Sequence, residues 1–128
     1  MSATNLVYAL LANTTYSFKF TVLFRSTSGT VGLKLGLTTP AFSVFAATAK
    51  IPIAGAGVGS ELQGPISASG GSVVGTAVPA QNVDYIAIVE GVIRPSAGGN
   101  LQLQFAAETT GATVTLKAES VGELQTFS

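Results

Sequence analysis

The 128-residue sequence contains no histidine, no cysteine and no tryptophan, and charged residues make up only 9% of it. In an ordinary soluble domain about a quarter of the residues are charged. Without histidine and cysteine, the Ser–His and Cys–His pairs that activate a nucleophile cannot form. The absence of cysteine also excludes a disulfide framework and cysteine-ligated metal sites. We therefore expect a protein that is not an enzyme and that works through contacts with other proteins.

The basic residues are too few and too scattered for a nucleic-acid-binding surface. Such surfaces neutralise phosphates with clustered lysine and arginine, whereas no two of the six basic residues are adjacent. They are Lys19, Arg25, Lys34, Lys50, Arg94 and Lys117. Six acidic residues balance them to a formal net charge of zero, and no nucleic-acid partner is expected.

No segment is suited to crossing a membrane, although 47% of the residues are hydrophobic. A spanning helix needs about 20 apolar residues in a row, and the sequence has no such run. Met1–Leu11 lacks a basic start, and its apolar part is too short for a signal peptide. A chain of this length fits one domain with one core. We expect a single domain over residues 1–128 with no membrane partner.

The acidic residues do not predict a metal or cofactor site. They are Glu61, Asp84, Glu90, Glu108, Glu119 and Glu123. No two of them lie in a compact ligand loop of the kind that binds calcium, so no cofactor is expected. Glu108 and Glu119 could approach each other across a predicted hairpin, as the paired carboxylates of a glycosidase do. We favour the alternative in which they are solvent-facing or interface charges.

Two further patterns have ordinary structural interpretations. Gly55–Gly59 is rich in glycine, but neither the lysine nor the helix of a phosphate-binding loop follows it. We interpret it as a flexible or interface-packed loop. Tyr8, Tyr16 and Tyr85 could form a sugar-stacking face. Since tryptophan is absent and Tyr16 lies in an inward register, we expect most of these tyrosines in the core.

Apolar residues alternate with polar ones over much of the chain, which is typical of half-buried strands. The clearest case is Thr15–Arg25, where aromatic and aliphatic residues occupy every second position. Asn100–Glu108, Thr113–Glu119 and Val31–Leu37 alternate in the same way, and the glycines of Val31–Leu37 favour a close backbone approach or a bulge. Shorter candidates for strands are Leu6–Leu10, Phe42–Ala49 and Val121–Phe127, and several short strands fit between Pro52 and Pro79.

Two arrangements of these strands are predicted in more detail. The short connection Thr109–Gly111 favours a β-hairpin between Asn100–Glu108 and Thr113–Glu119. Asp84–Ile93 is almost continuously apolar, as in a strand covered on both faces, and a subunit interface could supply the second cover. Gly91 within it favours a bulge or a close contact. The sequence thus predicts an all-β, single-domain, jelly-roll-like sandwich or barrel of about eight to ten short strands.

Three charged residues are candidates for an interface. Arg25 and Arg94 each end a predicted strand, and Glu90 lies four residues before Arg94. Because charges buried in an apolar protein are usually paired, a buried or inter-subunit ion pair between Glu90 and an arginine is one interpretation. Exposed arginines at strand ends are the other.

Several segments together resemble a β-rich domain of virion structural proteins of tailed bacteriophages. They are Leu11–Phe20 with Phe24–Ser26, Val89–Pro95, Gly99–Phe105, and Gly111–Ser120. The resemblance extends from about Leu6 to the C-terminus. One departure is Glu119, which precedes the serine of the last segment where the family usually has glycine.

The resemblance implies a virion protein that is jelly-roll-like, often trimeric and without catalytic residues. We expect a capsid decoration protein that forms a homotrimer and binds the major capsid protein or other virion proteins. A tail-tip or fibre module that recognises a host glycan or protein is the alternative. It expects a polar or aromatic groove in the loops of Gly55–Gly75, whereas decoration expects small, packed ones.

Overall fold

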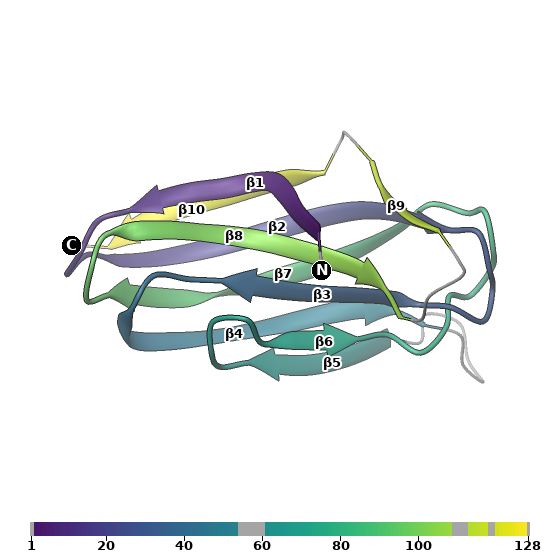
Figure 1. The fold of residues 1–128 in the computed structure, drawn as a ribbon, viewed down its shortest axis with the longest axis horizontal. Helices are drawn as coiled ribbons and strands as arrows, with labels where there is room; N and C mark the ends of the chain where they lie inside the picture. Colours follow the sequence, from purple (N-terminus) through teal and green to yellow (C-terminus); the bar gives the residue numbers. More distant parts are fainter. Residues whose placement is uncertain (1, 54–60, 109–112, 118–119, 128) are drawn as a thin grey trace.

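The computed structural model describes residues 2–53, 61–108, 113–117 and 120–127, and the side chains of residues 6–126 within these ranges. The described residues form ten strands and no helix (Figure 1). The strands are β1 (Ser2–Leu10), β2 (Thr15–Ser26), β3 (Leu33–Thr38), β4 (Phe42–Pro52), β5 (Glu61–Ile66), β6 (Ser72–Val74), β7 (Tyr85–Pro95), β8 (Gly99–Ala107), β9 (Val114–Leu116) and β10 (Val121–Phe127).

The strands form two antiparallel sheets that pack together as a β-sandwich. One sheet has four strands in the order β1-β8-β3-β6. The other has six strands in the order β10-β2-β7-β4-β5, with β9 also beside β2. The two sheets lie one in front of the other in Figure 1. The all-β class, the sandwich and the number of strands are confirmed.

The first eight strands pair as a long antiparallel ribbon folded over on itself. β4 pairs with β5, β3 with β6, β2 with β7, and β1 with β8. β9 and β10 then follow the free edge of β2, where Val114–Leu116 faces the C-terminal end of β2 and Val121–Phe127 faces the rest. Ser120 lies between β9 and β10 and is bound to β2, since its Oγ accepts a hydrogen bond from the Leu23 amide at 2.9 Å.

The core is built on β2, where burial alternates at every position from Thr15 to Ser26. Its inward side chains are Tyr16, Phe18, Phe20, Val22 and Phe24, and none is more than 4% exposed. Leu33, Leu35 and Leu37 of β3 and Leu101 and Leu103 of β8 cover them from the other sheet. The alternation predicted for these strands is confirmed, because one face of each sheet is removed from water.

Two of the glycines in predicted strands are required by close backbone approaches. A Cβ on Gly32 would overlap the carbonyl oxygen of Gly75. A Cβ on Gly91 would overlap the carbonyl oxygen of Ala46 and lie 2.7 Å from the Cα of Ala47 on β4. A side chain at either position would displace main chain, so the predicted close contacts are confirmed.

The predicted hairpin between Asn100–Glu108 and Thr113–Glu119 is wrong. β8 lies between β1 and β3 in the four-stranded sheet, whereas β9 pairs with β2 in the other sheet. Both edges of β8 are therefore already occupied. Alternation shows that a segment is a strand but carries no information on its partner, and the connection at Thr109–Gly111 lies outside the described residues.

Within the chain β7 is covered on one face, and a second cover from a subunit interface stays a prediction. The strand lies at the centre of the six-stranded sheet, between β2 and β4. Ala87, Val89 and Ile93 are buried in the core, whereas Ile86 and Val92 point outward and are 54% and 39% exposed. Within one chain only the inner face of β7 is covered. The predicted strand Phe42–Ala49 is part of β4, which continues to Pro52.

Candidate interaction surface

The outward side of the six-stranded sheet, here called the outer face, carries exposed aliphatic side chains. Val44, Ile86, Val92 and Val121 come from β4, β7 and β10, and each is between 39% and 54% exposed. The residues next to them along each strand are paired with core residues of the adjacent strand and point inward. These four side chains therefore point outward. Exposed aliphatic residues gathered on one face are typical of interaction surfaces.

Four charges of alternating sign cross the middle of the outer face, and we call them the charge row. Glu123 of β10 is the register partner of Lys19 of β2, and Lys19 is the partner of Glu90 of β7. The register partner of Glu90 on β4 is Thr48, and Lys50, two residues further along β4, completes the row by reaching back diagonally, with its Nζ 3.8 Å from Glu90 Oε1. Opposite charges on neighbouring strands stabilise a sheet by a few tenths of a kcal/mol to about 1 kcal/mol per pair.

Two shallow hollows flank the central strand on this face and meet at Glu90, Gly91 and Val92. One, of about 530 Å³, lies over β10, β2 and β7, and the other, of about 480 Å³, lies over β7, β4 and β5. Glu90 and Val92 point outward between the two hollows, whereas Gly91 is at an inward position of β7. The outer face is therefore hollowed on both sides of its midline.

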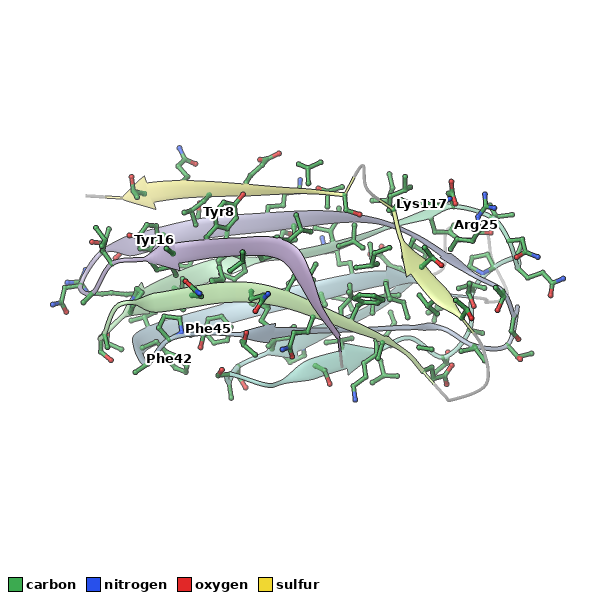
Figure 2. The ribbon with its side chains drawn as sticks, turned by 45° about the horizontal axis from the view of Figure 1, so that its top comes forward. Tyr8, Tyr16, Arg25, Phe42, Phe45 and Lys117 are labelled. Atoms are coloured by element: carbon green, nitrogen blue, oxygen red, sulfur yellow. The ribbon has the colours of Figure 1, made fainter. Side chains whose placement is uncertain are left out.

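The structure places the three predicted interface residues along the outer face, far apart from one another. Arg25 lies at one end, where its Nε is 2.8 Å from Asp84 Oδ1, and Lys117 Nζ is 3.9 Å from the same oxygen. Figure 2 shows Arg25 and Lys117 together, at the opposite end of the sandwich from Tyr16. Arg94 lies near that opposite end, where its Nη1 donates to Thr15 Oγ1 at 3.2 Å.

A pair between Glu90 and an arginine does not form within the chain. Glu90 and Arg94 lie on the same side of β7 but four residues apart, which is about 13 Å along a strand. Lys50 holds Glu90 instead, and the Glu90 side chain is 45% exposed rather than buried. A contact of Glu90 or either arginine with another subunit stays a prediction.

The outward side of the four-stranded sheet has a different character, and we call it the amide face. Asn100, Gln102 and Gln104 of β8 run down its centre. Val7 and Val74 are exposed on its flanking strands. Among the described side chains of this face, Lys34 is the one that carries a charge.

The structure gives the remaining candidates structural roles or leaves them outside the described residues. Glu108 Oε1 accepts a hydrogen bond from the Gly32 amide at 2.9 Å, which ties β8 to the chain entering β3. Glu119 and Gly55–Gly59 lie outside the described residues. Within the described ranges, no three acidic side chains come together as metal ligands. In the same part of the chain there is no helix long and apolar enough to cross a membrane.

One of the three tyrosines lies in the core, and the other two are partly buried and pack against it. Tyr16 is 4% exposed, and its hydroxyl oxygen accepts a hydrogen bond from the Leu11 amide at 3.0 Å. Tyr85 packs against Phe24, with ring centroids 6.2 Å apart. Tyr8 of β1 stacks on Phe20 at 5.9 Å, and its hydroxyl reaches Gly122 of β10. Tyr8 thus bridges the edges of the two sheets.

Stability at alkaline pH is expected to depend on Tyr8. Burial, and to a lesser degree the negative charge of Glu123, raises the pKa of the Tyr8 hydroxyl above its ordinary value near 10. The folded state therefore favours the neutral hydroxyl. The stability that comes from this preference is fully present below the pKa that Tyr8 has in the unfolded chain. It is lost as the pH rises through the pKa of Tyr8 in the folded state. Chemical unfolding between pH 9 and pH 11 should show a steeper loss of stability for the native sequence than for Tyr8→Phe. Parallel curves would contradict it.

No protein-family model matches the sequence, and neither the curated proteins nor the solved structures contain a match. The outer face must therefore be interpreted from its own residues. Sequence reasoning missed Lys19, Lys50 and Glu123 as members of the charge row. Their outward registers are visible in the sequence, but which strands are neighbours is not.

Proposed function

We propose that this protein is a non-enzymatic structural protein of a bacteriophage virion, a capsid decoration protein that acts as a homotrimer. The observation that carries the proposal is the presence of exposed aliphatic side chains on the outward sides of both sheets, in a chain that is 9% charged. Burying such surface contributes about 25 cal/mol per Å² before the costs of association. Few charges and exposed aliphatic residues fit a chain that is permanently covered by others.

The strand pairing supports the jelly-roll part of the proposal. A jelly roll is a double sheet of eight strands with two Greek keys. We infer that β1–β8 have this arrangement, because each of β1–β4 pairs with its counterpart in β5–β8 and the folded ribbon divides between two sheets. β9 and β10 are additions at the edge of β2.

The amide face is the surface we assign to one side of each trimer seam. In a three-fold assembly, one patch of each chain contacts a different patch of the next chain. A face with one charged side chain and exposed Val7 and Val74 loses little hydration when it is covered. The major capsid protein or other virion proteins are then the remaining partners, with the protein located in the virion.

The assembly part of the proposal predicts a mass of three chains, or a multiple of three, in solution. Light scattering coupled to gel filtration at micromolar concentration measures this mass directly against the 12.9 kDa chain. Covering the aliphatic side chains is the physical reason for association. A stable monomer under these conditions would contradict the proposal.

A receptor-binding module at a tail tip is the alternative, and the described part of Gly55–Gly75 gives it little support. Residues 61–75 contain no aromatic side chain, and Ile66 and Val73 within them are buried, although Gln63, Ser67 and Ser69 are exposed. Electron microscopy of particles with and without the protein, together with a host-cell binding assay, separates the two functions. Added density on capsids supports decoration, whereas binding to cells without binding to capsids supports the tail-tip function.

A further inference from the structure

We propose that the outer face of the six-stranded sheet is a two-fold contact with a second copy of this chain, aligned by the charge row. The inference goes beyond the proposed function, because it rests on the outer face alone and not on the trimer or the virion. In a two-fold contact the same patch of both copies is used, so the patch must be complementary to itself.

The order of charges along the row gives this self-complementarity. From Glu123 through Lys19 and Glu90 to Lys50, the signs run negative, positive, negative, positive. A two-fold axis parallel to the strands and midway between β2 and β7 reverses this order in the second copy. Lys19 of each copy then faces Glu90 of the other, and Glu123 faces Thr48, beside which the Lys50 side chain reaches back toward the row. A two-fold axis along the row would instead place like charges opposite each other.

The aliphatic side chains on both sides of the row fit the same axis. Leu23 and Ile86 are register partners on β2 and β7, so Leu23 of one copy lies over Ile86 of the other. Val121 is exposed on the same side of the charge row as Leu23 and Ile86. Val92 and Val44 are exposed on the other side of the row. Aliphatic burial supplies the free energy of association. The charges set the register and exclude other pairings.

The outer face is large enough for a weak, reversible contact. With the axis between β2 and β7, the four strands β10, β2, β7 and β4 overlap their images, and at about 4.8 Å between strands and about 3.3 Å per residue over seven residues they cover about 19 Å by 23 Å. Two such faces bury about 880 Å² in total, which is the size of a weak or transient interface. Twisted sheets pack face to face with their strands within about 30° of each other, so the twist of the sheet permits the contact.

Two opposite charge reversals test the inference. In Lys19→Glu the row has three adjacent negative charges, and in Glu90→Lys it has three adjacent positive charges, so each variant faces like charges at the centre of its own pair. We expect self-pairing of either variant to weaken at least about tenfold. An equimolar mixture of the two variants should pair with a dissociation constant within about threefold of the native one. In the mixed pair every charge along the row faces a charge of opposite sign. Analytical ultracentrifugation of the full chain over a concentration series measures this.

Controls separate pairing from folding and from the trimer. Thermal unfolding of both variants checks that they fold, since Lys19 and Glu90 point away from the core. Lys34→Glu makes the same chemical change on the amide face and should leave pairing intact. For the native protein, a mass of six chains supports both the two-fold pairing and the trimer. A mass of two chains supports the pairing without the trimer, and a mass of three chains supports the trimer without the pairing. Self-pairing of Lys19→Glu at native strength, or a mixture that fails to pair, would overturn the inference.

Discussion

Replacing Phe20 with alanine is expected to lower the free energy of unfolding by about 3–5 kcal/mol, as for other large buried aromatic residues. Phe20 is 0% exposed and lies on the inner face of β2. Its ring contacts those of Tyr8 and Phe18, each with centroids 5.9 Å apart. Since a domain is stable by only about 5–15 kcal/mol, the loss is a large part of the total. Urea unfolding followed by circular dichroism measures it.

Phe42→Ala is the matched control for Phe20→Ala. Phe42 lies at the start of β4, is only partly buried, and packs against Phe45 with centroids 5.2 Å apart. The same truncation there removes fewer buried contacts, so we expect a loss of about 1–2 kcal/mol. Equal losses in the two variants would contradict the central position of Phe20 in the core.

Gly91→Ala is expected to destabilise the protein by about 3 kcal/mol, although it adds a single carbon. The new Cβ would overlap main-chain atoms of Ala46 and Ala47. β4 cannot retreat freely, since β7 and β5 hold it on its two edges. At a strand position with free space, replacing glycine with alanine is favourable by about 0.5–1 kcal/mol. A loss of stability therefore indicates the close approach of β7 to β4 at Gly91. Chemical unfolding of the variant measures it.

Gly98→Ala provides the comparison for Gly91→Ala. A Cβ at Gly98 meets only the Leu10 carbonyl oxygen, at 3.6 Å, which is an ordinary contact. There we expect a change of at most about 1 kcal/mol, and a stabilising one if the unfolded chain loses freedom. If Gly91→Ala proved as harmless as Gly98→Ala, the close approach of β7 and β4 would be wrong.

The strands of this fold could be predicted from the sequence, whereas their pairing could not. Alternation along Thr15–Arg25 reports which side of one strand faces the core, and this depends on neighbouring residues only. The partner of a strand depends on residues far away in the chain. The sequence therefore predicts a hairpin between Asn100–Glu108 and Thr113–Glu119, although the strands in these segments lie in different sheets.

The same distinction separates the predicted interface residues from the charge row. Arg25, Glu90 and Arg94 are conspicuous in the sequence because they end or interrupt apolar strands. The row also needs Lys19, which is the register partner of Glu90, and Lys50, which approaches Glu90 diagonally from the position beside Ile88. A self-complementary order of charges is thus a property of the sheet, not of any one segment.

The folded-ribbon pairing of the strands has a consequence for synthesis of the chain. β2 emerges from the ribosome long before β7 and β10, which occupy its two edges. At about 5–20 residues per second, both edges of β2 stay unpaired for several seconds. An open, apolar strand is prone to pair with other chains during this time. Lys19 and Arg25 place charge within that strand, and charges in an apolar strand lower its tendency to aggregate before the folded protein gives them partners.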